Sequence, residues 1–154
     1  MPKTFLKAGD KAPNFKLLSD EGKEISLSDF KGQRLIVYFY PKASTPGCTV
    51  EACEFRDKQP KFKNEKVPVI GISADPVKAL ANFKLKQKLN FPLLSDPDHK
   101  VIEGFGVWQL KKFMGRTYMG IVRSTFLIGP DGKIEKVWGK VSTKGHAAEV
   151  LDSL

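Results

Sequence analysis

Cysteine, histidine and long apolar runs are all scarce in this sequence. Its 154 residues include two cysteines and two histidines, and no apolar run approaches the roughly 18 residues needed to cross a bilayer. The N-terminal stretch MPKTFLKAGDKAPNF has no apolar segment of the kind found in secretory signals. We therefore expect a cytoplasmic protein with no membrane segment, in a compartment that keeps thiols reduced.

The scarcity of metal-ligating residues argues against a metal site. His99 and His146 are far apart in the sequence and, with only two cysteines beside them, make a poor zinc set. We expect no metal and no other bound cofactor. In a reducing compartment the cysteines are not expected to form a structural staple either. Buried apolar residues or redox catalysts are the roles that fit them better.

The sequence also lacks linkers, internal repeats and low-complexity segments. A chain of 154 residues has the usual size of one domain, so we expect residues 1–154 to form a single domain. The net charge of +9 raises the question of nucleic-acid binding. However, the lysines are scattered, as in LKLKQKL and PKFKNEK, and form no basic stripe with interleaved aromatic residues. We therefore expect no nucleic-acid partner.

Buried strands and helices alternate from residue 34 onward. RLIVYFY (34–40) and VPVIGIS (67–73) are continuous apolar runs, typical of strands that are covered on both faces. A helical pattern extends from about Pro46 to Asn64 between them. Pro60 lies inside that pattern and is expected to kink or divide the helix.

A second helix is expected after the second of these strands, with Asp75 as its N-cap. The apolar residues that share one face of this helix are expected to be Val77, Leu80, Ala81 and Leu85. Residues 90–120 have a weaker pattern and include a glycine-containing loop, KKFMGRTYMG. Strands at 121–128 and 133–139 then flank a turn at 129–132. A final helix carries Ala147, Val150, Leu151 and Leu154 on one face.

This order of elements predicts an α/β protein with a thioredoxin-like fold. Alternating strands and helices require parallel pairing through right-handed crossovers, and the strands around the 129–132 turn add antiparallel partners. The stretch NFKLLSDEGKEISLSDF predicts an N-terminal β-hairpin turning at Asp20-Glu21-Gly22. The predicted architecture is thus a central mixed β-sheet flanked by helices, with that N-terminal hairpin and an insertion near residues 90–120.

The first cysteine lies in a sequence that is typical of a helix start. In Thr45-Pro46-Gly47-Cys48, Thr45 suits the N-cap and Pro46 the first helical position, so Cys48 falls at the third. Backbone N–H groups without helical partners and the positive end of the helix dipole both favour a thiolate at that position. Cys53 has no such surroundings. Its neighbours Glu51, Glu54 and Asp57 indicate a partly exposed helix face.

The two cysteines cannot form a disulfide while they share an intact helix. Residues five positions apart on an α-helix differ by about 7.5 Å in height and about 140° in direction, so their Cα atoms lie roughly 8–9 Å apart. A disulfide requires a separation below about 7 Å. If a Cys48–Cys53 bond forms, the first helical turns must therefore unwind.

The motifs of this chain resemble those of the peroxiredoxins. PKASTPGC fits the pattern P-x-x-x-T-x-x-C, and the continuation TVEAC is similar to the bacterioferritin comigratory protein, or peroxiredoxin Q, branch. The similarity extends through GISAD, LLSD, FGVW, FMGRTYMGI and RSTFLIGPDGKI. The resemblance implies a thiol-dependent peroxidase that reduces hydrogen peroxide and organic hydroperoxides.

The resemblance also implies a role for each of five residues. Cys48 matches the peroxidatic cysteine, which becomes a sulfenic acid, and Cys53 matches the resolving cysteine, which forms an intramolecular disulfide with it. Thr45 matches the residue whose hydroxyl holds the peroxide. Pro41 matches the residue that shields the thiolate, and Arg123, expected within a strand, matches the arginine that stabilises it. The implied reductant is thioredoxin or a related dithiol protein, and the chain is expected to be a monomer.

Without the family resemblance, the same residues are also compatible with ordinary structural roles. Cys48 could be a small buried residue, and Cys53 an idle thiol, with Cys48 resolved by an external thiol. Thr45 could serve only as a cap, and Arg123 could simply pair with a carboxylate. Two other functions compete with the peroxidase: a basic binding module with incidental cysteines, and a general disulfide exchanger. The absence of a Cys-x-x-Cys motif argues against the exchanger.

Overall fold

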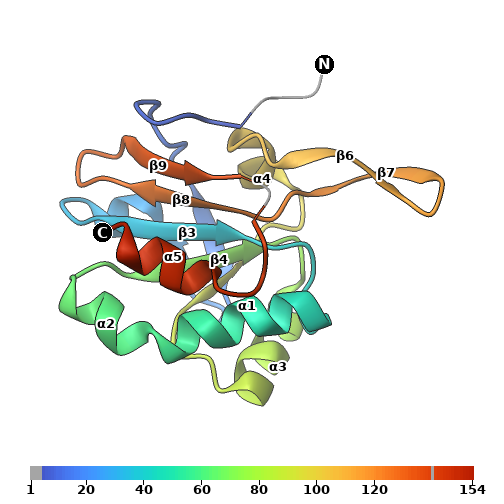
Figure 1. Ribbon diagram of the computed structural model, residues 1–154, viewed down its shortest axis with the longest axis horizontal. Helices are drawn as coiled ribbons and strands as arrows, with labels where there is room; N and C mark the ends of the chain where they lie inside the picture. The colour runs from blue at the N-terminus through green and yellow to red at the C-terminus, as the bar shows by residue number, and fades with distance from the viewer. Residues whose placement is uncertain (1–4, 140) are drawn as a thin grey trace.

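The computed structural model describes residues 5–139 and 141–154 and has a mixed β-sheet at its centre (Figure 1). Within these residues, one sheet contains seven strands in the spatial order β2-β1-β5-β4-β3-β8-β9. The strands of this sheet are β1 (Lys16–Ser19), β2 (Glu24–Ser26), β3 (Leu35–Phe39), β4 (Val69–Ser73), β5 (Leu93–Ser95), β8 (Ser124–Ile128) and β9 (Ile134–Trp138). β3, β4 and β5 pair in parallel, whereas the other neighbours pair antiparallel. The predicted mixed sheet and N-terminal hairpin are confirmed.

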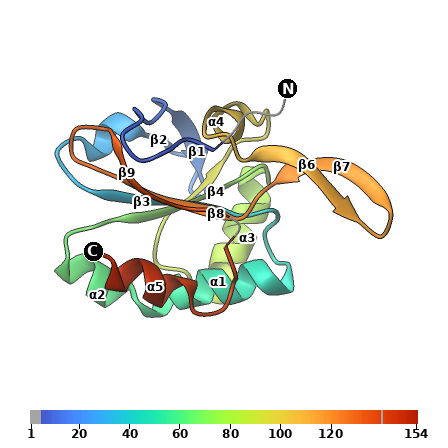
Figure 2. The same ribbon diagram turned by 45° about the horizontal axis from the view of Figure 1, so that its top comes forward.

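Helices cover both faces of the sheet (Figure 2). The helices that pack on one face are α1 (Pro46–Asp57), α2 (Gln59–Asn64), α3 (Val77–Gln87) and α5 (His146–Asp152). The opposite face is covered by α4 (Lys100–Gly104) and by the short 3-10 helix η1 (Leu27–Phe30). The predicted division of the first long helix is also confirmed, since α1 ends at Asp57 and Pro60 lies in the first turn of α2.

Strand β3 is the centre of the hydrophobic core. All five of its residues are buried. Ile36 and Tyr38 face α1, α2 and α5, whereas Leu35, Val37 and Phe39 face the opposite cluster. The continuous apolar run in the sequence thus reflects a strand with both faces covered. Its last residue leads directly into the loop before α1, so the core fixes the position of that helix start.

The start of α3 and its buried face differ from the prediction. The N-cap of α3 is Pro76, not Asp75, whose carboxylate instead accepts the backbone N–H of Ala43 at 2.8 Å. Leu80 and Phe83 are the buried residues of this helix. Leu85 is 80% exposed, because it lies about 140° around the helix from Leu80.

The segment expected to be a loop is a β-hairpin. β6 (Trp108–Phe113) and β7 (Arg116–Ile121) form a second, two-stranded sheet within the described ranges. Met114 and Gly115 both have positive φ, at 51° and 76°, which is the backbone signature of a type I′ turn. The prediction of a loop was wrong because Met is an unusual residue for the first central position of this turn.

Candidate active site

The loop between β3 and α1 is held in place by a carboxylate from the next strand. Asp75 accepts hydrogen bonds from the Ala43 backbone N–H and, at 2.7 Å, from the hydroxyl of Ser73. Pro41 lies at the beginning of this loop and is half-buried. Because the loop leads directly into α1, these bonds help to fix where the helix starts.

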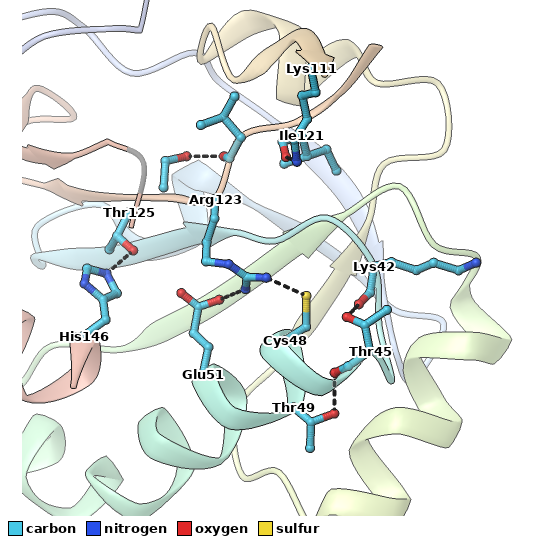
Figure 3. A network of polar contacts seen from close by, with 12 residues as sticks. Lys42, Thr45, Cys48, Thr49, Glu51, Lys111, Ile121, Arg123, Thr125 and His146 are labelled. Atoms are coloured by element: carbon cyan, nitrogen blue, oxygen red, sulfur yellow. Dashed lines mark hydrogen bonds and ion pairs between the residues drawn. The ribbon is translucent and has the colours of Figure 1, made fainter. Parts of the chain in front are cut away.

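The N-terminus of α1 has the arrangement that the sequence predicts, with one difference. Thr45 is the N-cap residue, Pro46 occupies the first helical position and Cys48 the third. The Thr45 side chain does not cap the helix: its hydroxyl donates to the carbonyl oxygen of Lys42 at 2.8 Å (Figure 3). The hydroxyl oxygen keeps lone pairs that can accept a hydrogen bond from a ligand.

Cys48 is buried against an arginine that lies 75 positions further along the chain. Its side chain is 1% exposed, and Nη2 of Arg123 donates a hydrogen bond to Sγ at 3.2 Å (Figure 3). A guanidinium N–H binds a charged acceptor more strongly than a neutral one. The contact therefore provides a charged hydrogen-bond donor for a thiolate at Cys48.

Arg123 lies between two strands rather than inside one, which corrects the prediction. β7 ends at Ile121 and β8 begins at Ser124, so Arg123 is in the short link between the hairpin and the central sheet. Its backbone carbonyl accepts the N–H of Val141 at 3.0 Å. Burial lowers the pKa of Arg123, but the neighbouring Glu51 and Cys48 outweigh burial, so its pKa is raised and the guanidinium stays charged.

Glu51 is the site residue that the sequence reasoning missed. It was expected on a partly exposed face, yet it is 1% exposed and accepts a hydrogen bond from Nη1 of Arg123 at 2.7 Å. The same guanidinium thus bridges Glu51 and Cys48, which are one helical turn apart on α1 (Figure 3). The spacing of three residues between a cysteine and a carboxylate was the available signal, since such residues share a helix face.

The carboxyl group of Glu51 has unusual acid–base behaviour. Burial raises its pKa to about 7, although Arg123 acts to lower it. One carboxylate oxygen, Oε2, has no hydrogen-bond partner among the described residues. A single ion pair to Arg123 therefore does not compensate the loss of solvent around this carboxylate.

His146 is a buried residue beside the site, and both of its ring nitrogens have hydrogen-bond partners. Its Nδ1 lies 3.1 Å from Glu149 and its Nε2 lies 2.7 Å from the Thr125 hydroxyl. Burial lowers its pKa, so the neutral ring donates through Nδ1 to the carboxylate and accepts from Thr125. Within residues 5–139 and 141–154, no group of three or more His, Cys, Asp or Glu side chains could hold a metal ion.

Cys53 lies further along α1, turned toward α3. Both cysteines are free thiols, and Cys53 is only partly buried. Its Sγ lies 3.6 Å from Oε1 of Gln87, at the end of α3. Arg56 on the next turn donates through Nη1 to the backbone carbonyl of Gln87 at 2.6 Å. The structure therefore brings Thr45, Cys48 and Arg123 together and leaves Cys53 apart on the same helix.

The fold and this site define a known class of proteins. The chain matches the AhpC/TSA family model over residues 8–137 and belongs to that family. Peroxiredoxin Bcp of Escherichia coli (strain K12) is 54% identical over 149 residues, which cover 97% of this chain and 96% of that protein. Peroxiredoxin Bcp of Bacillus subtilis (strain 168) is 48% identical, with 97% and 95% covered.

Solved structures of similar proteins have the same fold. A PrxQ mutant from Xylella fastidiosa superposes with a TM-score of 0.92 at 38% identity, covering 97% of this chain and 96% of that one. Peroxiredoxin Q from Xanthomonas campestris gives a TM-score of 0.88 at 37% identity, covering 99% and 96%. The resemblance to the bacterioferritin comigratory protein branch and the predicted thioredoxin-like fold are thus confirmed. The chain is a thiol-dependent peroxidase by family.

Proposed function

We propose that Cys48 is the peroxidatic cysteine, that Cys53 resolves it, and that the substrates are hydrogen peroxide and organic hydroperoxides. The observation that carries this proposal is the hydrogen bond from Arg123 to the buried sulfur of Cys48. The substrate class is supported by a structural relative from Xanthomonas campestris, a bacterioferritin comigratory protein described as having alkyl peroxide reduction activity.

In the first step the Cys48 thiolate attacks one oxygen of the peroxide. The O–O bond breaks, the sulfur is oxidised to a sulfenic acid, and the leaving oxygen departs as an alkoxide or hydroxide that takes up a proton. Arg123 stabilises the negative charge that moves from sulfur to the leaving oxygen. The Thr45 hydroxyl positions the peroxide, and Pro41 shields the thiolate from water.

In the second step Cys53 attacks the sulfur of the sulfenic acid. The S–O bond breaks, a disulfide forms and water leaves. Because both cysteines belong to α1, the turns between them must unwind before the sulfurs can meet. The free energy of this local unwinding contributes to the barrier of the step.

In the third step a dithiol protein reduces the disulfide by thiol–disulfide exchange. We propose thioredoxin or a related protein in this role, with the enzyme acting as a monomer in the cytoplasm. A disulfide made within one chain needs no second subunit. No helix in the described ranges is long and apolar enough to cross a membrane.

Stoichiometric peroxide titration tests the proposal. We expect one equivalent of peroxide to consume two thiols, and peptide mapping without reductant to recover one linked pair containing Cys48 and Cys53. Cys48→Ser should abolish peroxide consumption. Cys53→Ser should still form the sulfenic acid once but should lose turnover with thioredoxin. Undiminished thioredoxin-driven turnover of Cys53→Ser would refute the resolving role.

A further inference from the structure

The β6–β7 hairpin is an isolated two-stranded ribbon that projects from the body of the protein (Figures 1 and 2). We call residues 108–121 the β6–β7 ribbon. Its strands pair with each other from Trp108↔Ile121 to Phe113↔Arg116 and, among the described residues, form a sheet separate from the central one. A two-stranded ribbon alone has marginal stability in water, so a surface that covers this one would stabilise it.

Large apolar side chains are exposed on both faces of the ribbon. Leu110 and Met119 are cross-strand partners on one face, and Leu110 is 62% exposed. Side chains alternate along a strand, so Phe113 and Tyr118 lie on the opposite face, where they are also exposed. Met114 at the tip is 87% exposed. Concentrations of exposed apolar surface of this kind mark interaction sites.

The ribbon is also uniformly basic. Residues 107–122 contain Lys111, Lys112 and Arg116 and not a single Asp or Glu. Packing two copies ribbon against ribbon would bring like charges together, on a chain that already carries +9. The charge therefore favours a partner with acidic groups around an apolar contact.

The base of the ribbon is next to the active site. β7 ends only two residues before Arg123, whose guanidinium contacts Cys48. Lys111 donates through Nζ to the backbone carbonyl of Ile121 at 2.9 Å (Figure 3). Burial and, after it, the charge of Arg123 lower the pKa of Lys111, whereas Cys48 acts to raise it. A macromolecule bound to the ribbon would thus lie beside the cysteine that it has to serve.

We propose that the β6–β7 ribbon is the docking surface for the dithiol protein that reduces the Cys48–Cys53 disulfide, a partner with an apolar contact surface bordered by acidic groups. This inference rests on the proposed function. A transient partner explains why the surface is left uncovered between turnovers. A lipid surface would contact the tip alone, whereas exposed apolar residues lie on both faces of the ribbon, as far from the tip as Leu110 and Met119.

The test compares a protein reductant with a small one. Peroxidase turnover is measured with a bacterial thioredoxin, its reductase and NADPH, and separately with dithiothreitol. The variants are Lys112→Glu/Arg116→Glu and Phe113→Ser/Met114→Ser. The matched control is Lys61→Glu/Lys63→Glu, which changes the net charge equally on α2, away from the ribbon (Figure 1).

We expect each ribbon variant to lower kcat/KM for thioredoxin about tenfold or more. The same variants should match the wild type in their turnover with dithiothreitol and in their reaction with peroxide. The wild-type kcat/KM for thioredoxin should fall as salt rises, and this dependence should be weaker in the Lys112→Glu/Arg116→Glu variant. The control pair should remain within about twofold of wild type.

Several results would overturn the inference. One is an equal loss of thioredoxin-driven turnover in the control pair. Another is that the unmutated enzyme turns over with dithiothreitol but not with thioredoxin. A third is binding to anionic lipid vesicles that the ribbon variants lose, because it would assign the ribbon to a membrane surface. If the unmutated enzyme had no turnover with either reductant, the proposed function itself would be refuted. The failure of the inference and the failure of the proposed function can thus be distinguished.

Discussion

Arg123 donates to Cys48 Sγ at 3.2 Å across a sequence separation of 75 residues. The same guanidinium holds Glu51 at 2.7 Å, so one side chain from the link after the hairpin connects two positions on α1. The position of Cys48 Sγ thus depends on contacts between α1 and the link that leads into β8, the strand beside β3. Changes at Arg123 should therefore affect chemistry and stability together.

Replacement of Arg123 should slow the reaction with peroxide. Arg123→Lys keeps the charge but cannot reach Glu51 and Cys48 with two parallel N–H groups. We expect its second-order rate constant with hydrogen peroxide to fall roughly 10- to 100-fold, with Arg123→Met lower still. Stopped-flow oxidation under single-turnover conditions measures the rate. Arg34→Lys, at the other end of β3, is the control, and a rate within twofold of wild type for Arg123→Lys would contradict the assignment.

Glu51 should make stability depend on pH between about 4.5 and 7. Its pKa is raised from 4.5 to about 7 in the folded protein, so the native state binds the proton more tightly than the unfolded chain does. The stabilisation of the folded protein by this bound proton is complete below the unfolded pKa of 4.5 and is lost as pH rises through 7. Between these two pH values the free energy of unfolding of the wild type should fall by up to about 3 kcal/mol relative to that of Glu51→Gln.

Urea denaturation of both proteins at half-unit pH steps measures this difference. Glu65→Gln, an exposed carboxylate after α2, is the control and should follow the wild type. If the free energies of unfolding of the wild type and Glu51→Gln changed with pH in parallel, the pKa of the Glu51 carboxyl would not be raised by folding.

Loosening the attachment of α1 to α5 should speed disulfide formation. Oε1 of Glu54 accepts the backbone N–H of Gly145, the N-cap of α5, at 2.8 Å. Glu54→Ala removes this bond, at a cost to the folded helix of about 1 kcal/mol, and should therefore accelerate the step after sulfenic acid formation roughly fivefold. The second phase of stopped-flow oxidation reports this rate. An unchanged or slower second phase, judged against Glu65→Ala, would show that this contact does not limit unwinding.

The two leucines of α3 should respond very differently to truncation. Leu80 is fully buried in the core that also contains Cys48, whereas Leu85 is 80% exposed. Leu80→Ala should lower the free energy of unfolding by about 2–5 kcal/mol. Leu85→Ala should change it by less than about 0.5 kcal/mol. Thermal or urea unfolding checks both, and similar losses would mean that the helix face has been assigned incorrectly.

Local signals account for the parts of the fold that the sequence predicted correctly. The run at 34–40 is apolar on both faces of its strand, and Thr45-Pro46 specifies a helix start by backbone chemistry alone. A proline in the interior of a helical pattern ends or divides the helix, and Pro60 accordingly lies in the first turn of α2. Each of these features depends on a few neighbouring residues, so no knowledge of the tertiary structure was needed.

The features that were missed depend on contacts between distant segments. Glu51 is buried because Arg123 packs against its face of α1. No residue near either of them in the sequence indicates that the two will meet. Asp75 looked like a helix cap because its partner, the loop at Ala43, lies 32 residues away. The β6–β7 ribbon exposes apolar side chains on both faces and is buried only at its base, at Ile121, so it lacks the alternation by which most strands are detected.

The break between α1 and α2 limits how far the structural change on oxidation can spread. A helix that frays from Thr45 loses its hydrogen bonds in succession, but Pro60 has no N–H to extend that ladder into α2. Phe62, fully buried on α2, can therefore keep its place in the core while the preceding turns are open. An oxidised molecule would then wait for its reductant as a folded protein, with little new surface available to proteases or to aggregation.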